Sequence, residues 1–130
     1  MQLDYKEIDD AEIEELLEFR AYYLNRYVPR LQNPNENEEI VAWLKNDILL
    51  HRKAYQSIWW DGKKVGYVCL FRQDGQLHLD FLIIFEQYRD RGIGTAIVDT
   101  YIRNALKEER KLYLCAYLRD TASTLSLIHI

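Results

Sequence analysis

The hydrophobic residues change their spacing once along the chain, and this change limits the folds available to it. Over roughly the first 50 residues they recur at helical spacing in two stretches, whereas from Ala54 onward they alternate with polar residues as they do on strands. Asp61-Gly62 and Asp74-Gly75 interrupt the alternation with residues that tolerate positive φ, which favours tight hairpin turns. The sequence therefore predicts two helices followed by three antiparallel strands.

The flanking segments complete the expected order. Residues 3–8 predict an opening strand, and Asp9 or Asp10 is expected to cap the first helix. A third helix with a broad apolar stripe begins near Gly92, and residues 112–118 predict a buried strand. Because a helical crossover separates this strand from the third hairpin strand, we expect the two to be parallel. The order β-α-α-β-β-β-α-β indicates an α/β (α+β) protein with a mixed central sheet flanked by helices.

The third hairpin strand is expected to have one wholly apolar face and one partly polar face. The apolar face comprises Leu77, Leu79, Phe81, Ile83 and Phe85, and the other comprises His78, Asp80, Leu82 and Ile84. His78 and Asp80 are the polar side chains in the middle of this strand, so both are candidates for chemistry. The alternative is that His78 is an ordinary half-exposed histidine and that Asp80 pairs with a neighbouring strand.

Composition excludes several classes of protein. The 130 residues are 48% hydrophobic with a net charge of −4, which fits one globular domain and argues against a surface devoted to nucleic acid. The longest apolar run, residues 81–85, is far shorter than the ~20 residues of a membrane span, and residues 1–6 contain no apolar signal core. Cys69 and Cys115 lack metal-ligand spacing and lie in apolar runs, so we expect core positions and no metal. We expect a cytoplasmic protein without nucleic-acid or membrane partners.

The segment between the third hairpin strand and the third helix, residues 87–96, carries the strongest chemical signal. Its two glycines allow close approach of the backbone, and the first turn of the helix offers unpaired amides and a positive dipole end to an anion. Arg89 and Arg91 outnumber Asp90 there. A dinucleotide fingerprint would need a third glycine where Ile97 stands, and a Walker loop would need Gly-Lys-Ser/Thr. A phosphate site remains, and a turn without ligand is the alternative.

The spacing Arg89-x-x-Gly92-x-Gly94 matches Gln/Arg-x-x-Gly-x-Gly/Ala and resembles the coenzyme A loop of the GNAT N-acetyltransferase superfamily. Residues 84–89 also resemble the usual approach to that loop, with Glu86 in place of a frequent proline, and the predicted element order is similar over nearly the whole chain. The resemblance implies a GNAT-like acyl-CoA N-acyltransferase fold and an enzyme that transfers an acetyl group from acetyl-CoA to a primary amine of a small molecule or protein. The alternative is a non-catalytic acyl-CoA-binding or regulatory module.

The resemblance also implies roles for individual residues. Coenzyme-binding residues would be those whose backbone amides cradle the pyrophosphate, together with the residue that opens the loop and the strand that binds the pantetheine arm. They are Arg91, Gly92, Ile93, Gly94 and Thr95; Arg89; and Leu82, Ile83 and Ile84. The Ile84 amide is the candidate contact for the acetyl carbonyl. Some histone-acetylating members place a glutamate base at the offset of His78, so His78, with Asp80, is implied as the catalytic proton acceptor. The family often dimerises, which makes a homodimer an expectation.

Four aromatic residues of the first two helices fall in a region that lines the acceptor site in the family: Tyr22, Tyr23, Tyr27 and Trp43. Their helical spacing predicts core positions instead.

The end of the chain departs from the family pattern. Residues 125–130 look like the translation of a sequencing adapter, so the domain is expected to span residues 1–124 and to be incomplete; a short final strand is the alternative. The family's C-terminal helix, with the tyrosine that protonates the departing thiolate, and its final hairpin are missing, since no tyrosine follows Tyr117. We expect the complete protein to be an enzyme and this fragment to be weakly active.

Overall fold

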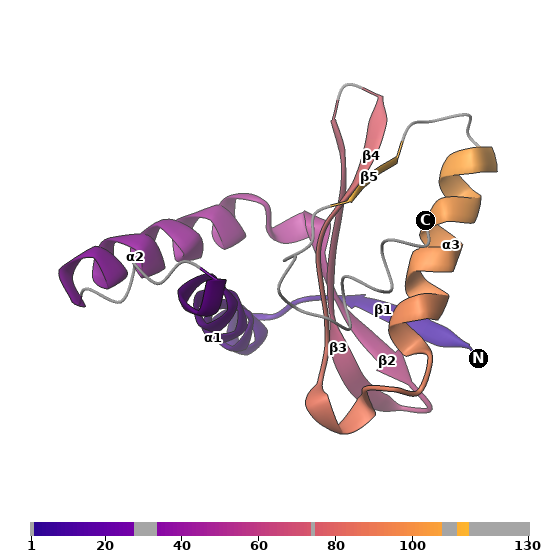
Figure 1. The fold of residues 1–130 in the computed structure, drawn as a ribbon, viewed down its shortest axis with the longest axis horizontal. Coiled ribbons are helices and arrows are strands. Elements are labelled where there is room, and N and C mark those ends of the chain that lie inside the picture. Colours follow the sequence, from indigo (N-terminus) through magenta and orange to yellow (C-terminus); the bar gives the residue numbers. More distant parts are fainter. Residues whose placement is uncertain (1, 28–33, 74, 108–111, 115–130) are drawn as a thin grey trace. The chain divides into compact units, whose positions relative to one another are not determined.

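The computed structural model describes residues 2–27, 34–73, 75–107 and 112–114, and its elements follow the predicted order (Figure 1). They are β1 (Leu3–Glu7), α1 (Asp10–Tyr27), α2 (Pro34–Leu50), the 3₁₀ turn η2 (Arg52–Ala54), β2 (Tyr55–Trp60), β3 (Lys63–Gln73), β4 (Gln76–Ile84), the 3₁₀ turn η3 (Glu86–Tyr88), α3 (Ile93–Lys107) and β5 (Leu112–Leu114).

The strands form one mixed sheet in the order β1-β2-β3-β4-β5. β3 and β4 are antiparallel, and β5 lies parallel to β4, as expected for a strand that follows a helical crossover. The turn between β2 and β3 has positive φ at both Asp61 (52°) and Gly62 (75°), as a type I′ hairpin turn requires. The predicted fold class is confirmed.

The chain divides into two compact units, which we treat separately. The sheet unit comprises residues 1–6 and 56–130, and the helical unit comprises residues 7–55. The single domain expected over residues 1–124 stays a prediction, and residues 115–130, including the suspected adapter, lie outside the described residues.

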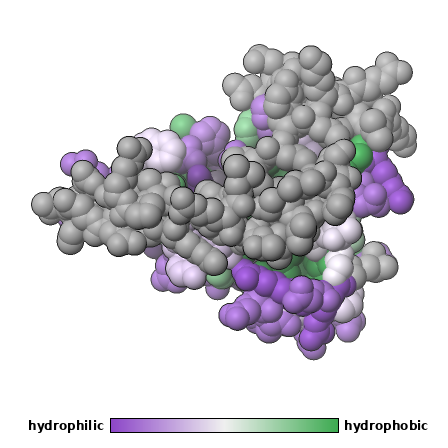
Figure 2. Space-filling model, in the orientation of Figure 1, coloured by the Kyte–Doolittle hydropathy of each residue, from purple (hydrophilic) through white to green (hydrophobic). Residues whose placement is uncertain are grey.

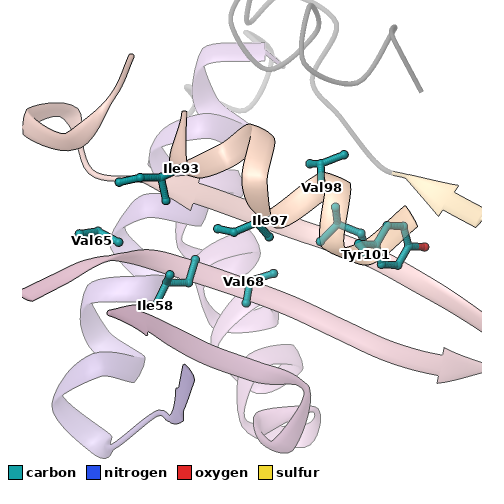
Figure 3. Close-up of a cluster of buried hydrophobic side chains, with 8 residues drawn as sticks. Ile58, Val65, Val68, Ile93, Ile97, Val98 and Tyr101 are labelled. Carbon is teal, nitrogen blue, oxygen red and sulfur yellow. The ribbon is translucent and has the colours of Figure 1, made fainter. Parts of the chain in front are cut away.

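The core of the sheet unit lies between α3 and the sheet, which the helix covers on one face (Figures 1 and 3). Ile93, Ile97 and Tyr101 recur every four residues along α3, so one stripe of the helix meets the strands. From the sheet, Ile58 of β2 and Val68 of β3 belong to the same buried cluster. This packing holds the start of α3 against the sheet from which the loop departs.

Two arginines connect the segments of the helical unit. Arg20 of α1 donates from Nη1 to Asp47 Oδ2 (3.0 Å) and to the Tyr55 hydroxyl (2.6 Å). Arg52 donates to Asp10 Oδ1 (2.9 Å) and to the Ile8 carbonyl (3.0 Å). Arg20 thus joins the middle of α1 to α2 and Tyr55, and Arg52 joins the start of α1 to the segment that follows α2.

The first turn of α1 is closed by its own side chains. Glu12 N donates to Asp9 Oδ1 (2.8 Å), and Asp9 N donates to Glu12 Oε1 (3.1 Å). Ile13 N donates to the Asp9 carbonyl (3.0 Å), so Asp9 is the N-cap residue of a reciprocal capping box. The predicted cap is therefore confirmed, with Asp9 rather than Asp10 in that role.

A β-bulge in β4 makes the predicted alternation of this strand wrong. Cys69 pairs with Phe81 and Leu70 pairs with Leu79, so Asp80 is an extra residue on β4. Leu79, Leu82 and Ile84 all belong to the cluster beneath α3 or pack against it, although strict alternation separates Leu79 from the other two. The extra residue shifts the period by one and brings both halves of the strand onto the same core.

The aromatic residues of α1 and α2 are only partly in the core. Tyr23 is buried, as its helical spacing predicts. Tyr22 and Trp43 are 58% and 61% exposed, so the core prediction is wrong for both. The side chain of Tyr27 lies outside the described residues.

Two further expectations concern burial and membranes. Cys69 is buried, in agreement with the predicted core position, whereas Cys115 lies outside the described residues. Within the described ranges, no helix combines the length and the apolarity needed to span a bilayer.

Candidate functional site

The loop between β4 and α3 is closed by a short series of backbone hydrogen bonds. Phe85 N donates to the Val65 carbonyl of β3 (2.8 Å), which anchors the loop where β4 ends. Tyr88 N then donates to the Phe85 carbonyl (2.8 Å), and Arg89 N donates to the Glu86 carbonyl (3.2 Å). The chain therefore turns tightly at η3 and reaches α3 close to the strand that it has just left.

The start of α3 leaves its amides without helical partners. The first helical bond runs from Ala96 N to the Gly92 carbonyl (3.0 Å), so the amides from Gly92 to Thr95 have no preceding carbonyl within the helix. The first turn of α3 contains no acidic residue. Together with the dipole of the helix, these amides make a site suited to an anion such as a phosphate.

Backbone conformation explains why residue 92 is a glycine. Asp90 has φ of 62° and Gly92 has φ of 79°, so the chain enters the left-handed region twice before α3 begins. Nothing lies within 4 Å of the position of a Cβ on Gly92, which shows that conformation and not space requires glycine there. Gly94 differs, because a Cβ there would lie 3.8 Å from Ile84 Cγ1 in an ordinary contact.

Two arginines lie beside these amides and make different contacts. Arg89 Nε donates to the Ile84 carbonyl (3.1 Å). The Arg91 guanidinium lies over the Tyr88 ring, 5.9 Å from its centroid. Both arginine side chains are exposed, and the lower end of Figure 2, where η3 lies in Figure 1, is largely hydrophilic. The two arginines predicted to make this loop basic therefore lie at the surface.

The polar backbone groups of Ile84 face away from β3. Phe85 N bonds to Val65, and the Ile83 carbonyl faces β3 beside Gly66, so the groups of the residue between them point to the opposite edge. The bond from Arg89 to the Ile84 carbonyl agrees with this direction, because Arg89 lies outside β3. Leu82 N faces the same edge by the same alternation. These two N–H groups therefore face the edge of β4 opposite to β3.

The partner of this edge is described only in part. The recorded pairs between β4 and β5 run from Leu77 with Leu112 to Leu79 with Leu114. Residues after Leu114 lie outside the described residues, and the pantetheine binding implied for Leu82, Ile83 and Ile84 stays a prediction.

Gly66 of β3 lies against the end of β4, and we did not single it out from the sequence. A Cβ at this position would collide with the Ile83 carbonyl oxygen, so only glycine lets β3 lie this close to the end of β4. Its signal in the sequence is an isolated glycine inside an alternating strand pattern, which is typical of a close backbone approach.

His78 and Asp80 lie in the half of β4 that precedes Leu82 and Ile84. The His78 imidazole stacks on the Phe71 ring of β3, with centroids 4.8 Å apart and planes 6° apart, and it is half-buried. Asp80 is exposed and is the extra residue of the bulge. Their catalytic roles stay predictions. Within the described ranges, no three histidine, cysteine or acidic residues gather as a metal site would require.

Comparison with known proteins addresses the family. The sequence pattern of the acetyltransferase (GNAT) family matches residues 12–124. A search of curated proteins gave no match.

Solved structures share the fold. The PaiA N-acetyltransferase from Thermoplasma acidophilum, in complex with coenzyme A, has a TM-score of 0.61 at 14% identity, covering 99% of this chain and 87% of its own. The YycN protein from Bacillus subtilis has a TM-score of 0.75 at 13% identity, covering 98% and 90%. A ribosomal-protein-alanine N-acetyltransferase from Brucella melitensis biovar Abortus 2308 has a TM-score of 0.59 at 20% identity, covering 99% and 90%. Because the family match spans most of the 130 residues and the fold agrees with it, the chain belongs to the acetyltransferase (GNAT) family.

Proposed function

We propose that the protein transfers an acetyl group from acetyl-CoA to a primary amine of a small molecule or protein. The observation that carries the proposal is the open first turn of α3, whose amides lack helical partners and follow the left-handed Gly92 in a GNAT family member. The PaiA structure contains coenzyme A, and the Brucella enzyme is named for an amino-group acceptor, which supports this donor and this class of acceptor.

The residues of the chain divide the binding of acetyl-CoA between the loop and the strand. The amides of residues 91–95 bind the pyrophosphate, with charge from Arg89 and Arg91. The outward N–H groups of Leu82 and Ile84 bind the pantetheine arm and the acetyl carbonyl. A backbone N–H held in this way stabilises negative charge as it develops on the carbonyl oxygen, and it needs no rearrangement during the reaction.

The amine must lose a proton before it attacks the thioester. An alkyl ammonium with a pKa near ~10.4 is neutral in fewer than about one molecule in a thousand at pH 7. We assign proton removal to His78, directly or through water, with Asp80 as the second candidate. The Phe71 stack supports His78, because it holds the imidazole in one orientation four residues before Leu82.

Thiol release from acetyl-CoA tests this function. The amine panel contains a peptide with N-terminal alanine, a lysine peptide, a polyamine and an aminoglycoside. We expect one class of amine to cause release of the thiol from acetyl-CoA. The same amine should gain 42 mass units, which corresponds to one acetyl group replacing a proton, at about the rate of thiol release.

Variants of the two candidate side chains separate chemistry from binding. His78→Gln or Asp80→Asn should lower the transfer rate about 100-fold, in the range of general-base catalysis, with acetyl-CoA affinity retained. His51→Gln is the matched control, since His51 is an exposed histidine of the helical unit, paired with Asp47 (3.2 Å). Tight binding of acetyl-CoA without transfer to any amine would instead favour a non-catalytic acyl-CoA-binding module.

A further inference from the structure

We propose that Arg89 is a positioning residue for the outward edge of β4, where the acyl-pantetheine part of the donor binds, and not only a charge for its phosphates. The inference rests on the proposed function, because it assumes that acetyl-CoA is the donor. It concerns a different part of the ligand from the part that the loop amides bind.

The geometry begins with the bond from Arg89 Nε to the Ile84 carbonyl (3.1 Å). η3 turns the chain back, so Arg89 returns to the strand that ended five residues earlier. A guanidinium donor makes a charge-assisted hydrogen bond, which is stronger than the neutral bonds of the sheet. Arg89 therefore restrains the last residue of β4.

Ile84 is the residue through which the loop contacts the strand at two points. Its carbonyl accepts from Arg89, and its side chain lies next to Gly94 in the first turn of α3. Its N–H and its carbonyl face the same edge of β4, away from β3. Fixing the direction of the carbonyl therefore also fixes the direction of the N–H group.

Restraint at this position matters because the N–H groups of Leu82 and Ile84 face this edge of β4. The bond from Arg89 to the Ile84 carbonyl is a side-chain contact to the same edge. The positive charge of Arg89 also lies near the edge where the donor's carbonyl oxygen would bind. This charge favours the negative charge that develops on that oxygen.

Arg91 provides the comparison that separates positioning from charge. It lies two residues away in the same exposed loop and carries the same charge. Its recorded contact is the Tyr88 ring, and not the strand. Loss of Arg91 should therefore affect the phosphates of the donor, whereas loss of Arg89 should also affect the rest of the donor.

The experiment compares a donor that has phosphates with one that lacks them. Affinities for acetyl-CoA and for S-acetylpantetheine are measured by calorimetry with the wild-type protein and with Arg89→Gln, Arg89→Lys and Arg91→Gln. Arg103→Gln controls for loss of charge, since Arg103 is exposed on α3 and paired with Asp99 (3.1 Å). The infrared carbonyl stretch of each donor, labelled with ¹³C at the acetyl carbon, reports polarisation of the bound acetyl group.

We expect Arg89→Gln to lower the affinity for S-acetylpantetheine about tenfold. The carbonyl stretch of the bound donor should move toward that of the free thioester. Arg89→Lys should recover affinity for acetyl-CoA, because the charge is kept, but not for S-acetylpantetheine, because the planar Nε donor is lost. Arg91→Gln should weaken acetyl-CoA more than S-acetylpantetheine. Arg103→Gln should change neither affinity.

Wild-type affinity of Arg89→Gln for S-acetylpantetheine, with an unchanged carbonyl stretch, overturns the inference and leaves the proposed function intact. If circular dichroism shows that Arg89→Gln is unfolded, the same criterion applies to Arg89→Lys. A wild-type protein that binds neither donor overturns the proposed function itself. The two failures are therefore distinguishable.

Discussion

Two helices of this protein begin in opposite ways. α1 begins with Asp9 and Glu12, which accept hydrogen bonds from each other's backbone amides and place negative charge at the positive end of the helix. α3 begins with Gly92, which has no side chain, and its first turn contains no acidic residue. The first amides of α1 are thus capped by side chains, whereas those of α3 have no partner within their helix.

The difference shows how a helix start is assigned to stability or to binding. A reciprocal cap stabilises the helix by about 1 kcal/mol, and its carboxylates repel any other anion. A glycine start gives up this stabilisation and keeps both the amides and the dipole available. The residues at and just after the cap therefore indicate which of the two roles a helix N-terminus has.

The largest expected effect comes from changing the conformation of the open start. Gly92→Val places a β-branched residue at φ of 79°, where a side chain costs about 1–2 kcal/mol and moves the first turn. Acetyl-CoA affinity should fall at least about 100-fold, because several charge-assisted hydrogen bonds of roughly 1.5–3 kcal/mol each are lost together. Titration calorimetry measures the loss.

Gly94→Ala is the matched control, because a Cβ at Gly94 makes an ordinary 3.8 Å contact with Ile84 Cγ1. It should change acetyl-CoA affinity less than threefold, which is within roughly 0.7 kcal/mol. Equal losses for the two variants would mean that the left-handed conformation at Gly92 is not what forms the site.

A smaller effect is expected when α3 is given the acidic character of α1. Thr95→Asp places a carboxylate among the amides of the first turn, where it should stabilise the helix by about 0.3–1 kcal/mol. The same charge should weaken acetyl-CoA about tenfold, by repulsion of roughly 1–4 kcal/mol at 4 Å. Thermal unfolding and calorimetry measure the two effects, and Thr95→Asn is the uncharged control. A stabilised variant with unchanged affinity would place the phosphates elsewhere.

The smallest effect is expected from opening the closed start. Asp9→Ala removes the side-chain acceptor for Glu12 N and should lower the free energy of unfolding by about 1 kcal/mol, with acetyl-CoA affinity unchanged. Glu12→Gln keeps the capping geometry and should cost less. Chemical denaturation measures both variants, and an unchanged midpoint for Asp9→Ala would show that the cap does not stabilise α1.

Much of the fold could be predicted from the sequence, because its elements depend on local signals. The period of the hydrophobic residues predicts the element order, and the Asp61-Gly62 turn and the Asp9 cap follow from the backbone preferences of single residues. The exposure of Tyr22 and Trp43 could not be predicted, because helical spacing alone does not show how wide the buried stripe of a helix is.

The candidate site divides in the same way. The left-handed turn before α3 could be predicted, because positive φ favours the glycine that stands at Gly92, whereas the binding role of the loop stays a prediction. The side chains of His78 and Asp80 depend on the register between β3 and β4. Strict alternation assumes that no strand contains an extra residue, so the faces that it predicts on the two sides of Asp80 do not match the structure.

The extra residue Asp80 sets the direction in which the side chains and backbone groups of the later part of β4 face. Deleting it would force either the stretch before or the stretch after it to turn over. If the later stretch inverted, the amides of Leu82 and Ile84 would point at β3 while the glycine loop kept its sequence. Under the proposed function, such a protein would keep the loop amides assigned to the nucleotide end of the thioester and would lose the strand amides assigned to its acyl end.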